Sequence, residues 1–247
     1  VEMMLDATQN YEKPLLKQRL FGWHASLFPT GYSGMHRINV GAWRNDERGP
    51  MQVVSGRVGK EHVHYQAPDA KRLGAEMDRF LEWFDANAQI DPVLKAGLAH
   101  MWFVTIHPFD DGNGRIARAI ADLALARAEQ SPQRFYSMSS QIRKEREAYY
   151  DMLEATQKQE TGDVTPWLLW FLNCLDRAII GAETTLGIVL QKAKFWEVHS
   201  TSNFNERQRD MINRLFNGLE GKLSTSKWAK IEKCSTDTAL RDITDLI

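Results

Sequence analysis

Apolar residues recur at helical spacing along most of this 247-residue chain, and this periodicity is the feature that most restricts its fold. Runs typical of extended strands are scarce. The spacing predicts helices over residues 70–86, 92–106, 115–129, 139–157, 166–196 and 206–219. Pro92 and Pro166 mark two of the helix starts, since proline suits the first helical position. We therefore expect a mainly α fold in which helices pack on helices.

One segment, residues 51–65, departs from the helical pattern. Two short extended runs flank a stretch that contains glycines at positions 56 and 59, which predicts a β-hairpin. His62 and His64 lie on one face of its second strand, because side chains alternate along a strand. Two imidazoles could begin a metal site, but no third ligand is evident from the sequence.

Residues 107–118 read HPFDDGNGRIAR and combine the parts that a phosphate-binding site needs. A dense turn signal at 110–114 precedes a helical pattern, so a loop leads into a helix N-terminus. Free backbone N–H groups and the helix dipole attract anions at such a place. Gly112 and Gly114 permit backbone conformations that aim several N–H groups at one phosphate.

The side chains of this segment add charge and a base. Arg115 and Arg118 lie three residues apart and so share one helix face, where both can bind a polyphosphate. The carboxylate of Asp110 or Asp111 suits Mg²⁺, which prefers oxygen ligands. His107 is the side chain best suited to accept a proton near neutral pH.

This segment resembles the motif of the Fic family, His-x-Phe-x-Asp/Glu-Gly-Asn-Gly-Arg-x-x-Arg, at every specified position. The resemblance covers roughly residues 1–219. It implies a Fic-type helical domain in which the hairpin at about 51–65 is the flap, a hairpin that pins a target segment by strand addition. Most family members transfer AMP from ATP to a hydroxyl of a target protein. The resemblance therefore implies a protein AMPylase that uses ATP and Mg²⁺, with auto-modification included.

The resemblance also assigns roles to residues. His107 would take the proton from a Ser, Thr or Tyr hydroxyl of the target protein, and Asp111 would bind Mg²⁺. Phe109 would point into the core and fix the loop. The residues that would bind the nucleotide are Gly112, Asn113 and Gly114 around the α- and β-phosphates, Arg115 near the β-phosphate, Arg118 at the γ-phosphate and Tyr150 at the adenine. A packing role for Tyr150 is the alternative.

Composition narrows the partners and the setting. The formal net charge of −1 argues against a general polyanion-binding surface, although it does not exclude a local basic patch. The two cysteines, Cys174 and Cys234, lack metal-type spacing and favour a reducing, cytoplasmic setting. We expect no membrane contact, because no apolar run approaches the length of a membrane span.

Residues 220–247 have a different pattern. Two short helical segments, 226–233 and 236–247, are separated at Cys234, and Ser235 suits the N-cap of the second. This predicts a helix-turn-helix that resembles the start of the winged helix attached to many Fic proteins. DNA binding, assisted by nearby lysines, is one reading; protein docking, homodimerisation and simple helical packing are the others.

Many Fic enzymes carry an inhibitory motif, Ser/Thr-x-x-x-Glu-Gly/Asn, whose glutamate would pair here with Arg118. No segment of this chain completes that motif. The resemblance implies either an inhibitory helix upstream of Val1 or inhibition by a separate partner. Two further functions stay open from sequence alone, namely a Fic enzyme that uses another nucleotide or removes AMP, and a DNA-binding regulator with a Fic sensor domain.

Overall fold

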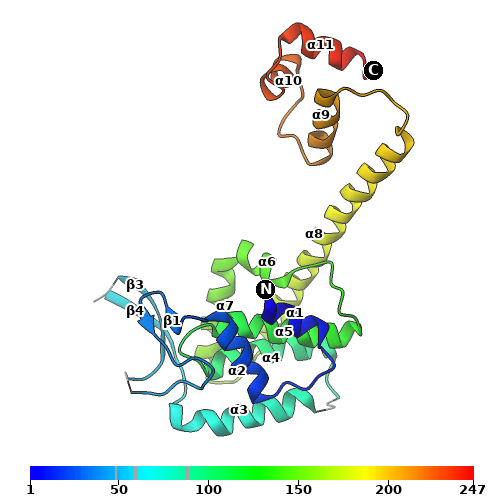
Figure 1. The fold of residues 1–247 in the computed structure, drawn as a ribbon. Helices are drawn as coiled ribbons and strands as arrows, with labels where there is room; N and C mark the ends of the chain where they lie inside the picture. Colours follow the sequence, from blue (N-terminus) through cyan, green and yellow to red (C-terminus); the bar gives the residue numbers. More distant parts are fainter. Residues whose placement is uncertain (48, 58–59, 87–88) are drawn as a thin grey trace. The chain divides into compact units, whose positions relative to one another are not determined.

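The computed structural model describes residues 1–47, 49–57, 60–86 and 89–247. The chain is mainly helical, which confirms the predicted fold class (Figure 1). The elements are α1 (Glu2–Gln9), α2 (Lys17–Leu27), β1 (Tyr32–Ser33), β2 (His36–Arg37), β3 (Gln52–Arg57), β4 (Lys60–Gln66), α3 (Ala70–Asp85), α4 (Pro92–Ile106), α5 (Asn113–Glu129), α6 (Met138–Lys144), α7 (Arg146–Lys158), α8 (Thr165–Val198), α9 (Glu206–Phe216), α10 (Thr225–Ile231) and α11 (Thr236–Thr244).

The chain forms two compact units, Val1–Ile179 and Ile180–Ile247, and α8 contributes to both. The sequence places the end of a catalytic core at residue 219 instead. The units are defined by packing, and α9 shares a core with α10 and α11. The extent of the catalytic domain therefore stays a prediction, and each unit is described by itself.

The first unit is built around α4 and α5, which pack against each other along their length. Phe103 of α4 and Ile116, Ile120 and Leu123 of α5 are fully buried. α4 is apolar around most of its circumference because α3, α5 and α8 side chains cover it. Asp91 caps α4 by accepting hydrogen bonds from the Val93 and Leu94 amides at 2.9 and 3.1 Å.

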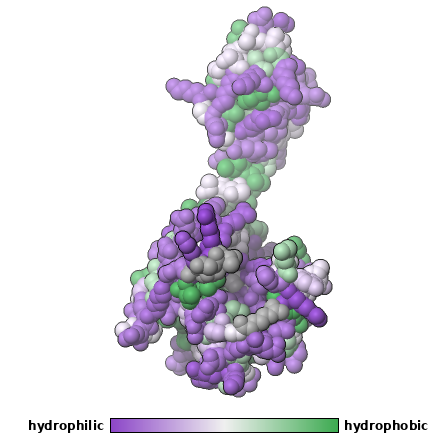
Figure 2. All heavy atoms as spheres, turned by 90° about the vertical axis from the view of Figure 1, so that its left-hand side faces the viewer, coloured by the Kyte–Doolittle hydropathy of each residue, from purple (hydrophilic) through white to green (hydrophobic). Residues whose placement is uncertain are grey.

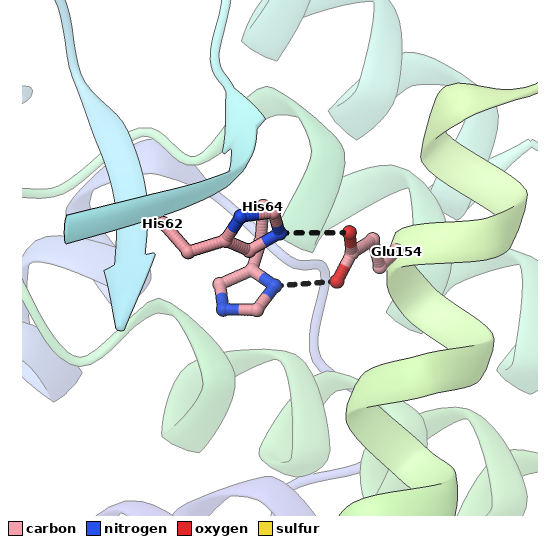
Figure 3. Close-up of side chains that lie close together, drawn as sticks. All are labelled: His62, His64 and Glu154. Atoms are coloured by element: carbon pink, nitrogen blue, oxygen red, sulfur yellow. Dashed lines mark hydrogen bonds and ion pairs between the residues drawn. The ribbon is translucent and has the colours of Figure 1, made fainter. Parts of the chain in front are cut away.

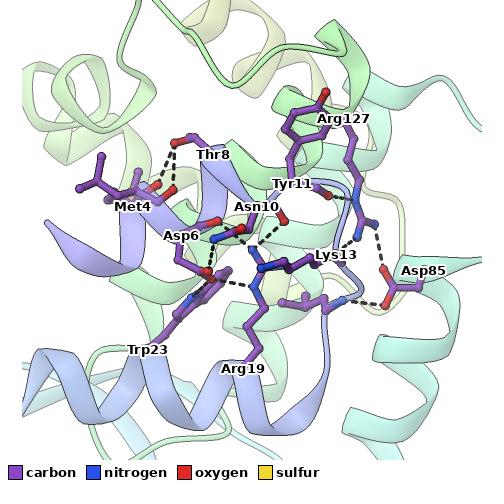
Figure 4. A network of polar contacts seen from close by, with 12 residues as sticks. Met4, Asp6, Thr8, Asn10, Tyr11, Lys13, Arg19, Trp23, Asp85 and Arg127 are labelled. Carbon is purple, nitrogen blue, oxygen red and sulfur yellow. Dashed lines mark hydrogen bonds and ion pairs between the residues drawn. The ribbon is translucent and has the colours of Figure 1, made fainter.

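The helices α1 and α2 are absent from the sequence-based expectations, and tertiary contacts hold them in place (Figure 4). The Asp6 carboxylate of α1 accepts hydrogen bonds from Arg19 Nε and Trp23 Nε1 of α2, both at 2.7 Å. Arg127 of α5 donates to the Tyr11 carbonyl at 2.8 Å and pairs with Asp85 of α3 at 2.8 Å. Short helices like these draw their stability from packing rather than propensity, so periodicity alone does not reveal them.

The predicted hairpin is present as β3 and β4, paired antiparallel; its tip, residues 58 and 59, lies outside the described residues. The Tyr65 hydroxyl donates to the Thr105 carbonyl at 2.8 Å and fixes the hairpin to the end of α4. Residues on the molecular face that carries β3 and β4 are mainly hydrophilic, with apolar residues in small patches (Figure 2). The hairpin therefore lies on a mainly polar face.

Most predicted helices differ in extent from the observed ones, and three of the differences have a visible structural basis. The run predicted at 139–157 is two helices, α6 and α7, that meet at Glu145, whose φ of −109° and ψ of 33° are not helical. Glu145 there binds Arg177 of α8 through two oxygens at 2.6 and 2.5 Å. The helix predicted at 206–219 ends at Phe216, and Gly218 follows with a φ of 88°. The helix predicted at 115–129 starts two residues earlier, at Asn113.

The second unit has a small core of its own. Met211, Trp228 and Ala239, from α9, α10 and α11, are its most buried residues. Ser235 caps α11 as predicted, because its hydroxyl accepts from the Thr238 amide at 3.1 Å. The helix–turn–helix is thus present in outline, and a winged helix stays a prediction. None of the helices in the described part of the chain combines the length and apolar character that a bilayer crossing requires.

Candidate nucleotide-binding site

His107 lies where α4 ends and the loop at 107–112 begins. It adopts a left-handed conformation with a φ of 52° and a ψ of 57°, and its amide still closes the last helical turn on Phe103 at 3.0 Å. A positive φ is uncommon for a residue with a β-carbon and often occurs at functional positions. The conformation ends α4 and turns the chain into the loop.

The ring of His107 has a defined tautomer. Its Nδ1 lies 3.1 Å from the Val104 carbonyl, and a carbonyl can only accept, so Nδ1 carries the proton and Nε2 is the basic nitrogen. Burial lowers the pKa of His107 to about 4, although the hydrogen bond to Val104 opposes the shift. The imidazole is therefore neutral at pH 7 and can accept a proton through Nε2.

Arg44 is a buried charge that sequence reasoning missed. Its Nε donates to the His107 carbonyl at 2.8 Å, its amide donates to the Pro108 carbonyl at 2.9 Å, and its guanidinium pairs with Asp46 at 2.8 Å. Asp46 in turn accepts from the amide of Ala70 at the start of α3 at 2.6 Å. Arg44 thus fixes the backbone of the loop to a distant segment, and nothing in its local sequence distinguishes it from a surface arginine.

Phe109 and Asn113 fix the conformation of the loop through buried contacts. The Phe109 ring is fully buried and stacks on His24 with centroids 4.2 Å apart, as the core position predicted for it requires. The Asn113 side chain accepts from the Phe109 amide at 2.9 Å and donates to the Phe109 carbonyl at 2.7 Å. Both polar atoms of the Asn113 side chain are therefore engaged within the loop. Only the backbone N–H of Asn113 is left to bind a phosphate.

Gly112 is required at the N-cap of α5 for two reasons. Its φ of 84° lies in the left-handed region, and a β-carbon there would lie 2.9 Å from Cε2 of Phe28. The turn brings the first amides of α5, those of Asn113 and Gly114, to the open end of the helix, where no preceding carbonyl can pair with them. These amides and the helix dipole would form the anion site that the sequence predicts.

The Asp111 carboxylate lies beside this helix end and is half-exposed. It accepts from Ser33 Oγ at 2.5 Å and lies 3.6 Å from the Arg115 guanidinium, which also packs over the Phe28 ring. His24 Nδ1 accepts from the Gly41 amide at 3.1 Å, so its Nε2 carries the proton and donates to the Asp111 carbonyl at 3.2 Å. A half-exposed carboxylate next to an anion site fits a hard divalent cation such as Mg²⁺.

Arg118 projects from α5 toward a buried polar pair that the sequence did not reveal. His100 Nε2 and the Tyr149 hydroxyl share a hydrogen bond of 2.9 Å, and both residues are buried. Burial, together with the smaller effect of the positive charge of Arg118, lowers the pKa of His100 to about 3. Burial also raises the pKa of Tyr149, which keeps the hydroxyl neutral beside Arg118.

A cavity of 780 Å³ brings together most of the predicted site residues, although Gly112 and Arg115 do not line it. Tyr150 is half-exposed on its wall, as the predicted adenine contact requires, while the neighbouring Tyr149 is buried against His100. Arg115 faces an adjoining cavity of 460 Å³ instead, which also contains Arg118. The predicted residues that line the larger of these two cavities are His107, Asp111, Asn113, Gly114, Arg118 and Tyr150.

Comparison with known proteins finds a family match within the first unit. The family model described as the Fic/DOC family matches residues 14–125. The protein adenylyltransferase Fic of Culex quinquefasciatus is 32% identical over 114 residues, which cover 45% of this chain and 21% of that protein. The protein of the same name from Drosophila melanogaster is 31% identical over 114 residues. The chain therefore spans about a fifth of the length of these curated relatives.

Solved structures agree in fold. A Fic-domain-containing signalling protein from Bacteroides thetaiotaomicron has a TM-score of 0.55 at 22% identity, covering 73% of this chain and 66% of that one. A Fic family protein from Desulfovibrio desulfuricans has a TM-score of 0.56 at 23% identity, covering 97% of this chain and 63% of that one. At such identities the likeness concerns the fold alone.

Proposed function

Because the chain belongs to the Fic/DOC family through residues 14–125, we propose that it is a protein adenylyltransferase. It transfers AMP from ATP to a Ser, Thr or Tyr hydroxyl of a target protein, its own chain included. The observation that carries the proposal is one cavity that joins a base, His107, to a carboxylate, a helix N-terminus and Arg118. The names of the matched relatives support the same reaction.

The chemistry follows from these groups. His107 Nε2 takes the proton from the target hydroxyl as that oxygen attacks the α-phosphorus. The bond between the α-phosphorus and the bridging oxygen to the β-phosphate breaks, and pyrophosphate leaves. The amides at the start of α5 hold the phosphates, and Arg118 neutralises charge on the leaving group.

Asp111 would hold a divalent cation, most simply Mg²⁺. Such an ion would neutralise charge on the phosphate oxygens and on the departing pyrophosphate. The fit rests on the half-exposed Asp111 carboxylate, which Ser33 orients by a hydrogen bond of 2.5 Å. Asp110 is committed elsewhere, because its carboxylate accepts from the Asn39 amide at 2.8 Å.

The target segment would lie along the β3–β4 hairpin, which serves as the flap. A second cavity of 1080 Å³ runs from Tyr32 and Ser33 past Gln52 and Val54 to Asp111, so it adjoins the nucleotide cavity. An extended peptide added to the edge of β3 would pass this point, with affinity from backbone hydrogen bonds rather than from sequence. Binding through the peptide backbone would bring a target hydroxyl to His107 without a pocket that selects particular side chains.

A nucleotide panel tests the nucleotide half of the proposal. Thermal unfolding is measured with ATP, GTP, CTP and UTP, each with Mg²⁺, and a ligand at about 100 times its Kd should stabilise by roughly 2.7 kcal/mol. We expect ATP to give the largest shift, and Arg118→Ala to reduce it. A larger shift with another nucleotide would mean that this nucleotide, and not ATP, is the substrate. No shift with any of the four nucleotides would contradict the proposed site.

A further inference from the structure

A cluster of metal-ligand side chains lies on the flap, away from the loop at 107–112. His62 and His64 of β4 point toward Glu154 of α7 (Figure 3). One ligand atom from each residue lies within 4.8 Å of the other two. The sequence pairs the two histidines but gives no hint of the third residue, because Glu154 comes 90 residues after His64 and reaches it only through folding.

The separations are close to those of ligands around a bound ion. His62 Nε2 lies 3.6 Å from Glu154 Oε1, and His64 Nδ1 contacts Glu154 Oε2 directly. Zinc ligands at 2.0–2.1 Å in a tetrahedron are separated from one another by roughly 3.3 Å. An ion would replace the direct contact between His64 and Glu154 and would be reached by His62 as well.

The backbone and a second hydrogen bond prepare His64 for this role. The hairpin register shifts between Val53 and Val54, so Val54 pairs with Val63, Val53 pairs with Tyr65, and His64 is the extra residue. Ser55 Oγ lies 2.6 Å from His64 Nε2. This contact engages the nitrogen that faces away from Glu154, as the partners of metal-bound histidines commonly do.

We propose that His62, His64 and Glu154 form a binding site for a divalent transition-metal ion, with Zn²⁺ as its best-fitting occupant. Two imidazoles and one carboxylate suit zinc, whereas Mg²⁺ prefers oxygen ligands alone. Three protein ligands leave a fourth position open to water. The site is separate from the carboxylate Asp111, which would hold the cation of the nucleotide.

A bound ion would connect the flap to the wall of the nucleotide cavity. His64 and Glu154 line the same cavity as His107, and Glu154 lies one helical turn after Tyr150. Coordination would fix β4 against α7 more firmly than the present contacts do. It would therefore limit the movement of the strand edge that receives the target segment.

Metal titration of the intact, tag-free chain tests the site. After treatment with a chelator, isothermal titration with Zn²⁺ should give one bound ion per chain, and Co²⁺ should give the visible absorption of a tetrahedral complex. We expect His62→Ala, His64→Ala and Glu154→Gln each to weaken binding at least about tenfold. His36→Ala is the matched control, since this exposed histidine of β2 lies outside the cluster. The Zn²⁺ affinity of the His36→Ala variant should equal that of the wild type.

Two further variants separate coordination from simple flap stability. Ser55→Ala should weaken Zn²⁺ binding by about 10–100-fold, because the orientation of His64 is lost. Lys158→Ala should strengthen binding, since the Lys158 ammonium occupies Glu154 Oε1 and competes with the ion. Metal-free thermal unfolding of each variant checks that the chain folds.

No Zn²⁺ binding to the wild type, or equal binding to the three ligand variants, would overturn the proposal. The readout is metal binding itself, so the result is independent of whether the chain transfers AMP.

Discussion

At the scale of single residues, the protonation of His107 decides the pH range of the proposed reaction. The base must be neutral, and burial lowers its pKa from 6.5 to about 4. The neutral form is therefore present at all pH values above the folded pKa and is lost only as the pH falls through it. An unperturbed histidine would lose half of its base form at pH 6.5.

We accordingly predict that kcat/KM for AMP transfer changes little between pH 8 and about 5 and declines only near pH 4, because kcat/KM reports the free enzyme. The pH profile of AMP transfer to a fixed acceptor measures this, with nucleotide binding followed in parallel. An acid limb centred near 6.5 would show that the ring is not held neutral by burial.

Gly112 offers a second residue-scale prediction. Gly112→Ala forces a β-carbon into a left-handed backbone and against Phe28, and should lower the free energy of unfolding by about 1–3 kcal/mol. It should also weaken ATP binding, since it moves the amides at the start of α5. Gly74→Ala, at an open position of the helix α3, is the control and should stabilise by about 0.5–1 kcal/mol. Urea unfolding measures both, and equal effects would contradict the argument.

The residues of the site differ in how far the sequence reveals them. His107, Asp111 and Arg118 lie in one contiguous string whose chemistry can be read directly, and the structure places all three at one cavity. Arg44 lies 63 residues before His107, and His100 and Tyr149 lie 49 residues apart on either side of the 107–118 segment. Their roles depend on burial and on contacts between distant segments, which local patterns do not contain.

At the scale of elements, the carboxylate of Asp6 connects α1 to α2. Burial raises the pKa of Asp6, but hydrogen bonds from Arg19, Trp23 and Asn10 outweigh burial and leave the pKa below 3.8. Because the folded pKa is lowered, this stabilisation is present above the unfolded value and is lost as the pH falls through the folded one. The carboxylate is about one-third exposed, so solvent reduces its effect.

We predict that Asp6→Asn lowers the free energy of unfolding by about 1 kcal/mol at neutral pH. The gap between variant and wild type should shrink as the pH is lowered below 3.8, since the wild-type carboxyl then becomes neutral as well. Urea unfolding at neutral and acidic pH measures this gap. Asp78→Asn, the same substitution at a carboxylate of the helix α3, is the control. A gap that is constant with pH would rule out the ionised contact.

The elements themselves were predictable where the periodicity is long. The helices α3, α4 and α5 and the β3–β4 hairpin follow from spacing and turn residues. The division between α6 and α7 does not follow from the sequence, because glutamate is a good helix former. In the structure Glu145 is not helical, and its carboxylate pairs with Arg177 of α8. A tertiary ion pair overrides local propensity there.

At the scale of the whole molecule, the chain contains two packed units with separate cores. Trp228 is almost fully buried in the smaller core. Trp228→Ala should destabilise residues 180–247 by about 3–5 kcal/mol and leave ATP affinity unchanged. Calorimetry combined with ATP titration tests both parts. A loss of ATP affinity would show that the second unit contributes to the nucleotide site.

The proposed reaction itself is tested most directly by following two labels. The intact chain, alone and mixed with cell lysate, is incubated with Mg²⁺ and ATP that carries a label on either the α- or the γ-phosphorus. We predict that protein bands acquire the α-label and not the γ-label, and that His107→Ala abolishes the transfer because the base is lost. Incorporation of the γ-label, or α-labelling that persists in His107→Ala, would contradict AMP transfer at this site.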